Sequence, residues 1–131
     1  MTTENNKATV RKMVEAHGAG DVAGFLAPMA DDVDFRYMTA HAGLAATRTK
    51  QQVYESWTAG SGQTVDGVRM KLRSIVGDGD VVCMEAEAKT KRLNGSDYHN
   101  RLAFIFVFRD DKIVAVRAYT DTYHVNAVWS S

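Results

Sequence analysis

The sequence predicts an α+β domain in which N-terminal helices pack on one face of a curved antiparallel sheet and close it into a cone. Three observations lead to this prediction. Apolar residues recur at helical spacing in the first half of the chain, whereas from residue 65 onward they alternate with polar residues in four successive runs. Turn residues, among them Gly77 to Asp80, separate these runs. The 131 residues suit one domain that spans 1–131.

Three helices are expected in the first half of the chain. The first follows a polar tail over residues 1–6, which we expect to be frayed, and it ends with His17, where a positive charge is favoured. Gly18 to Asp21 ends this helix and caps the next one, and Thr49 caps the third. The expected helices cover residues 7–18, 21–29 and 50–58.

The long alternating run from Tyr98 to Arg109 dominates the strand predictions. One of its faces is aromatic and apolar, and the other is charged at its ends and apolar in the middle, so both faces of the sheet need cover. A turn then returns the chain into a second run that ends at Asp121. The expected strands cover residues 33–38, 65–76, 81–91, 98–109 and 113–121, and residues 39–47 form a loop that contains His41.

Composition argues against several classes of partner. The 16 basic residues balance the 16 acidic ones, so no net field recruits nucleic acid. No apolar run approaches about 18 residues, so we expect no membrane span, no secretory signal and a cytoplasmic location. Cys83 is the single cysteine, and His99 and His124 have no further ligands at metal spacing. We therefore expect no metal and no cofactor.

Short motifs in a fixed order give the chain a resemblance to a known superfamily. The motifs are Ala19-Gly20-Asp21, Ala30-Asp31-Asp32-Val33, Val53-Tyr54-Glu55-Ser56-Trp57, Tyr98-His99-Asn100, Asp111-Lys112-Ile113 and Arg117 to Thr122. Together they resemble the SnoaL-like branch of the nuclear transport factor 2-like (ketosteroid isomerase-like) superfamily, from about Val10 to Val125. The resemblance implies a cone-shaped α+β barrel, with N-terminal helices packed on a strongly curved antiparallel or mixed sheet. It also implies a deep pocket, and usually a dimer through the outer face of the sheet. It implies no single activity, because the fold hosts isomerases, cyclases, hydrolases, dehydratases and binders.

Strand parity predicts which residues line the pocket. The aromatic face of the long strand is expected to point inward, and Ala103, Ile105 and Val107 to form an apolar outer face that supports a homodimer. The predicted ligand-binding residues are Met13, Phe25, Tyr37, Trp57, Met84, Asn100, Phe104 and Ala118. The residues expected to point away from the pocket include Glu85, Arg117 and Asp121.

Several catalytic positions of the superfamily carry residues here that cannot transfer protons. Ketosteroid isomerase-like members have a Tyr and two Asp at three catalytic positions. By resemblance, the corresponding residues of this chain are Met13, Tyr37 and Phe104. SnoaL-like cyclases have a His and an Asp where it has Phe104 and Ala118, and limonene epoxide hydrolase-like members have charged residues where it has apolar ones. Because general acid–base catalysis needs an ionisable group within reach, the resemblance disfavours these three reactions.

Tyr37 and His41 are the candidates for handling a proton. The Tyr37 phenol either donates a hydrogen bond to a ligand oxygen or belongs to the core. His41 either acts at the mouth of the cone near neutral pH or is a surface histidine. Asn100 either contacts the ligand or bonds to the neighbouring strand. Asp121 is expected to cap a segment or to contact a dimer partner rather than the ligand.

Three hypotheses about function follow. The first is a protein that binds a small, mostly apolar molecule in a deep pocket. The second is a lyase, cyclase, isomerase or epoxide-hydrolase-like enzyme on a polyketide, terpenoid or steroid-like substrate, with Tyr37 and His41 handling protons. The third is a dimeric interaction module whose cavity is vestigial.

Overall fold

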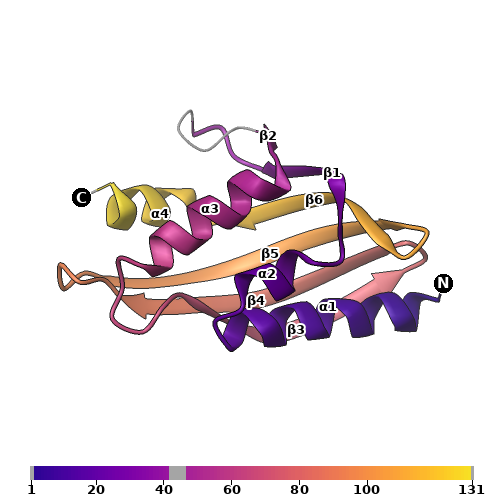
Figure 1. The fold of residues 1–131 in the computed structure, drawn as a ribbon, viewed down its shortest axis with the longest axis horizontal. Coiled ribbons are helices and arrows are strands. Elements are labelled where there is room, and N and C mark those ends of the chain that lie inside the picture. The colour runs from indigo at the N-terminus through magenta and orange to yellow at the C-terminus, as the bar shows by residue number, and fades with distance from the viewer. Residues whose placement is uncertain (1, 42–46, 131) are drawn as a thin grey trace.

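The computed structural model of the protein describes residues 2–41 and 47–130. Figure 1 shows helices at both ends of the chain and a sheet built mostly from its second half. The elements are α1 (Thr3–Gly18), α2 (Val22–Leu26), β1 (Met29–Tyr37), β2 (Thr47–Arg48), α3 (Lys50–Ser61), β3 (Arg69–Asp78), β4 (Val81–Lys91), β5 (Asp97–Arg109), β6 (Lys112–Thr120) and α4 (Thr122–Trp129).

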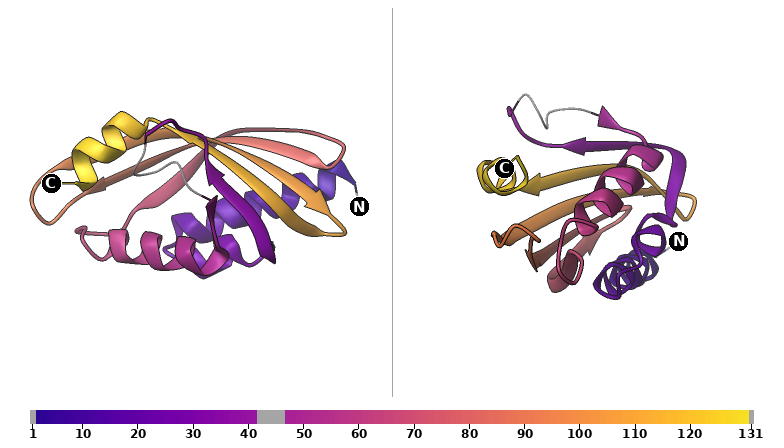
Figure 2. Two further views of the ribbon diagram at one scale, coloured as in Figure 1. Left: turned by 90° about the horizontal axis from the view of Figure 1, so that it is seen from above. Right: turned by 60° about the vertical axis from the view of Figure 1, so that its left-hand side comes forward.

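The six strands form one curved, unclosed sheet in the order β2-β1-β6-β5-β4-β3. β1 runs parallel to β6, and the other neighbouring pairs are antiparallel. Figure 2 shows α1, α2 and α3 on one side of this sheet and α4 at one end of it. The α+β class, the mixed sheet and the N-terminal helices packed on it are therefore confirmed.

The strand register agrees with the predicted parity. Phe104 of β5 pairs with Ala118 of β6 and with Met84 of β4, so these three side chains share one face of the sheet. All three are buried, whereas Ile105 and Val107 lie on the opposite face and are only partly buried. The outer face thus carries apolar side chains as expected, and the homodimer through that face stays a prediction.

An aromatic cluster forms the centre of the core. The rings of Phe25, Phe35, Phe104 and Phe106 are all buried, and each of the other three contacts Phe104 at a ring-centroid distance of 5.9 to 6.3 Å. The apolar stripe of α1 packs against β3 and β4, as its helical spacing predicts. This packing fixes the positions of the sheet and the helices relative to each other.

The N-terminus differs from the expectation. The chain is helical from Thr3, and the Thr2 hydroxyl accepts a hydrogen bond from the Asn5 N–H at 3.1 Å. The prediction of a frayed tail is therefore wrong for residues 3–6, because a threonine at the N-cap satisfies one of the free amides of the first turn. Asn6 is 1% exposed, so this turn belongs to the folded domain.

Some boundaries and one short strand also differ. β1 begins at Met29 rather than at Val33, because Met29 already pairs with Ile113 ahead of a register shift in the strand. β3 begins at Arg69, four residues later than expected. The predicted loop over residues 39–47 ends in β2, and its residues 42–46 lie outside the described part of the chain.

α4 was not predicted from the sequence. Asp121 is its N-cap and accepts a hydrogen bond from the His124 N–H at 3.1 Å, which confirms the capping role expected for Asp121. The helix packs against β5 and supplies one end wall of the molecule. Over residues 2–41 and 47–130, no helix combines the length and apolarity that crossing a membrane requires.

Candidate functional site

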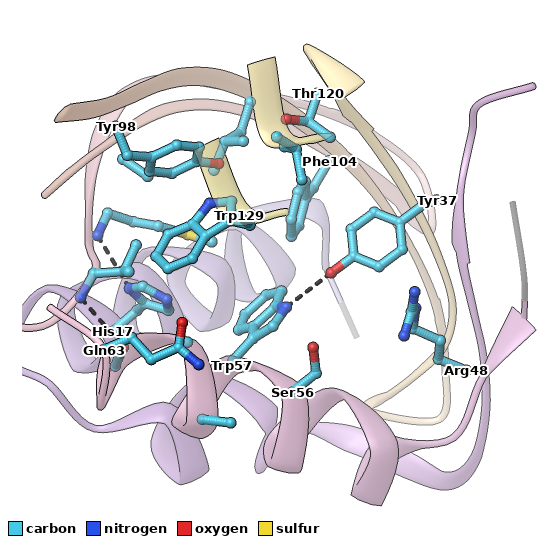
Figure 3. A pocket seen from close by; sticks show the side chains of 18 residues that line it. His17, Tyr37, Arg48, Ser56, Trp57, Gln63, Tyr98, Phe104, Thr120 and Trp129 are labelled. Atoms are coloured by element: carbon cyan, nitrogen blue, oxygen red, sulfur yellow. Dashed lines mark hydrogen bonds between the residues drawn. The ribbon is translucent and has the colours of Figure 1, made fainter. Parts of the chain in front are cut away.

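A cavity of about 410 Å³ lies between the sheet, α3 and α4. Its walls are mostly apolar and aromatic, with a few polar side chains from separate elements (Figure 3). The lining residues are His17, Tyr37, Arg48, Ser56, Trp57, Ala59, Gly60, Ser61, Gln63, Val68, Met70, Ala88, Tyr98, Leu102, Phe104, Thr120, Val125 and Trp129. The size is typical of a site for a small organic molecule.

Trp57 projects from α3 into the middle of the cavity wall. A capping box fixes the start of α3, since the Thr49 hydroxyl and the Gln52 side chain each bond to the other residue's backbone N–H. The indole ring contacts Phe104, and its Nε1–H donates a hydrogen bond of 2.8 Å to the Tyr37 hydroxyl. Burial raises the pKa of Tyr37, so the phenol stays protonated near neutral pH.

His17 lies at the end of α1 and lines the cavity with its ring. It is 4% exposed and packs against Phe25 and Trp57. Its Nδ1 accepts a hydrogen bond from the Met70 N–H at 3.0 Å, which places the proton of the neutral ring on Nε2. Burial lowers the pKa of His17 from 6.5 to about 4. The expected positive charge at this helix end is therefore wrong, because desolvation outweighs the favourable helix terminus.

α4 closes the cavity with Val125 and Trp129 and is held by side chains outside the helix. The buried guanidinium of Arg92 donates to the Val128 carbonyl at 2.6 Å and to Gln63 Oε1 at 2.9 Å, and it lies over the Trp129 ring. These contacts tie the last turn of α4 to the segment that follows α3. The cavity wall therefore depends on a charged group that does not itself line the cavity.

Asn100 holds the other end of α4. Its Oδ1 accepts from the Asp121 N–H at 3.1 Å, and its Nδ2 donates to the Asp121 carbonyl at 3.3 Å and to the Tyr98 hydroxyl at 3.1 Å. Both ends of the amide are thus used by the protein. Of the two roles considered for Asn100, the structure shows the bond to the neighbouring backbone. Burial raises the pKa of Tyr98, whose ring stacks on His124.

Thr120 carries an unpaired hydroxyl in the cavity wall. Its Oγ1 is buried and has no hydrogen-bond partner among the described residues. We expect Thr120→Val to raise the free energy of unfolding by about 1 kcal/mol, because valine has the same shape and removes a desolvated polar atom. Urea denaturation would measure this change. Thr90→Val is the matched control and should destabilise the protein, since Thr90 Oγ1 donates to the Gly67 carbonyl at 2.9 Å. A destabilised Thr120→Val protein would contradict the prediction.

Three of the eight predicted ligand-binding residues line the cavity, namely Tyr37, Trp57 and Phe104. The other five lie outside the lining and are buried in the core, namely Met13, Phe25, Met84, Asn100 and Ala118. Of the two proposed proton-handling residues, only Tyr37 lines the cavity. The backbone N–H of His41 donates to Thr39 Oγ1 at 3.0 Å, and the residue is outside the lining.

Sequence reasoning missed most of the polar lining. His17 had a signal, because it follows Met13 and Val14 at spacings of four and three residues and so shares their buried helix face. Strand parity also turns Thr120 inward, although parity alone does not mark it as a site residue. Arg48, Gln63 and Trp129 come from a two-residue strand, a loop and an unpredicted helix, none of which has a periodic pattern that could have identified them.

Comparisons with known proteins identify the family of this chain and several proteins of similar structure. Residues 10–116 match the model of the SnoaL-like domain family. A comparison with curated proteins finds no match. Among solved structures, an NTF2-like protein of unknown function from Burkholderia pseudomallei has a TM-score of 0.79 at 20% identity, with 100% of each chain covered.

Two structures from Streptomyces are also similar. AclR, a hydroxylase candidate from Streptomyces galilaeus, has a TM-score of 0.80 at 15% identity, with 96% of each chain covered. IdmH, a polyketide cyclase candidate from Streptomyces antibioticus, has a TM-score of 0.73 at 18% identity, with 95% of this chain and 97% of that chain covered. At these identities the likeness shows the fold alone.

Proposed function

The chain belongs to the SnoaL-like domain family, and on this basis we propose that it binds a small, mostly apolar, oxygenated molecule in the cavity between the sheet, α3 and α4. The observation that carries the proposal is the composition of the lining. Large apolar surfaces from Trp57, Phe104 and Trp129 face a volume of about 410 Å³. Burying one apolar group of the size of a leucine or phenylalanine side chain against such walls contributes about 1.5–3 kcal/mol to binding.

The titratable groups of the lining favour binding over proton transfer. The described residues contribute no carboxylate to the lining. Burial lowers the pKa of His17 to about 4 and raises the pKa of Tyr37 and of Tyr98. A general acid or base works best with a pKa near the working pH, and these three groups are all shifted away from neutrality. This supports the binder over the cyclase, isomerase or hydrolase alternative.

The neutral polar groups in the lining suit a ligand that carries oxygen atoms. The neutral His17 ring has a proton on Nε2, and Ser56, Ser61 and Gln63 add neutral polar side chains to the lining. Such groups orient a ligand without changing its chemistry. The two Streptomyces proteins of the same fold are described as candidates for a hydroxylase and a polyketide cyclase, and an oxygenated ligand is compatible with both descriptions.

Quenching of tryptophan fluorescence by methyl 2-naphthoate, a neutral aromatic ester, would test the proposal. Both tryptophans of the chain line the cavity, so the intrinsic fluorescence reports on it directly. We expect saturable quenching by the ester in the wild-type protein. Ala88→Leu should weaken this binding at least about ten-fold, because the added atoms occupy cavity space and overpack the site against a bound ligand.

Ala103→Leu is the matched control. It adds the same atoms, but to the outer face of the sheet, whereas Phe104 lies on the face toward the cavity. It should leave the affinity for the ester unchanged. Circular dichroism would establish that both variants are folded. The proposal is wrong if the wild-type protein shows no saturable quenching, or if the Ala88 and Ala103 variants bind the ester equally well.

A further inference from the structure

Arg48 is the one side chain among the described lining residues that is charged at neutral pH. It lies in β2, where it pairs with Phe35 of β1, and its guanidinium lies over the Tyr37 ring at 5.1 Å from the ring centroid. Figure 3 shows Arg48 beside Tyr37 and Ser56, across the cavity from His17 and Gln63. A positive charge therefore marks one end of an otherwise neutral cavity.

The charge of Arg48 is not neutralised by the described residues. Its Nε is buried and has no hydrogen-bond partner there, and no described carboxylate forms an ion pair with it. The adjacent arginine on β1 differs, since Arg36 Nε bonds to Asp34 Oδ1 at 2.9 Å. Burying part of an unpaired guanidinium costs free energy unless an anion compensates it.

The chemistry of the guanidinium identifies the anion. Its planar fork of N–H donors matches the two oxygens of a carboxylate, and such charge-assisted pairs are about twice as strong as neutral hydrogen bonds. Resting on the proposed function, we propose that the cavity takes an apolar carboxylic acid, with the carboxylate against Arg48 and the apolar body between Trp57 and Phe104. Stacking on Tyr37 then serves to hold the guanidinium in place for this contact.

A matched pair of probes separates this inference from the proposed function. 2-Naphthoate and methyl 2-naphthoate have the same ring system and differ in charge at the carboxyl group. We expect the wild-type protein to bind the naphthoate more tightly than the ester. Arg48→Gln should weaken binding of the naphthoate by about ten-fold or more and leave binding of the ester within about two-fold. Arg48→Lys keeps the charge but loses the fork, so it should retain part of the preference for the naphthoate.

Arg36→Gln is the matched control, because it removes one positive charge from the neighbouring position in the sheet without touching the cavity lining. It should bind both probes as the wild-type protein does, and thermal unfolding would establish that all variants are folded. If the wild-type protein binds the ester but prefers it over the naphthoate, the inference is wrong and the proposed function stands. The inference is also wrong, and the proposed function again stands, if Arg48→Gln weakens both probes equally. If the wild-type protein binds neither probe, the proposed function fails and the inference fails with it.

Discussion

Between pH 6.5 and pH 4 the wild-type protein is expected to lose about 3 kcal/mol of stability that the His17→Asn protein does not lose. Burial lowers the pKa of His17 from 6.5 in the unfolded chain to about 4 in the folded protein. In this window the unfolded chain binds a proton that the folded protein does not bind. The contribution of neutral His17 to the free energy of unfolding is therefore fully present above pH 6.5 and is lost as the pH falls toward 4.

Urea denaturation at several pH values would measure this difference. Asparagine is the informative replacement, because its side-chain oxygen takes a position close to Nδ1 and accepts from the Met70 N–H, yet it does not titrate. Carboxylates protonate in the same range, but they do so in both proteins and cancel in the comparison. Equal pH dependence in the two proteins would contradict a neutral, desolvated His17.

Asn100→Leu is expected to lower the free energy of unfolding by about 2–4 kcal/mol. Leucine is similar in size, but it leaves both the N–H and the carbonyl of Asp121 without the partners that Asn100 supplies at 3.1 and 3.3 Å. Because Asp121 is the N-cap of α4, the loss of stability should be concentrated in α4. Val125 and Trp129 should then leave their places in the cavity wall, and the affinity for methyl 2-naphthoate should fall with the stability.

Urea denaturation and amide hydrogen exchange across residues 122–129 would measure the two effects. Asp121→Asn is the matched control, because asparagine caps a helix as well as aspartate and keeps the same backbone groups. It should change neither the stability nor the affinity by more than a small amount. A loss of less than about 1 kcal/mol in Asn100→Leu would show that α4 is held in place without the amide.

The sheet could be predicted from the sequence because its information is local and periodic. Alternation over residues 98–109 was enough to place Phe104 inward, and the observed pairing with Ala118 and Met84 follows from that parity. Thr49 and Asp21 were also predicted correctly as caps, because capping depends on a side chain and an amide three residues away. These features need no knowledge of the rest of the fold.

The candidate site was less predictable because its polar residues come from elements that only tertiary contacts stabilise. α4 has eight residues with several β-branched and aromatic side chains, so its intrinsic helix propensity is low, and packing together with Arg92 and Asn100 maintains it. β2 consists of two residues that pair with β1, and this pairing brings Arg48 to the cavity. No pattern within the sequence of either segment carries that information.

The attachment of α4 through Arg92 and Asn100 has a consequence for how such a cavity diversifies. The Arg92 guanidinium and the Asn100 amide bond to backbone groups at the two ends of α4, and Arg92 also lies over the Trp129 ring. Val125 lines the cavity from the middle of the helix and takes part in none of these contacts. Substitutions at Val125 can therefore change the shape of the cavity and keep the contacts that anchor the helix. A library randomised at this position would sample new cavity shapes on an unaltered scaffold.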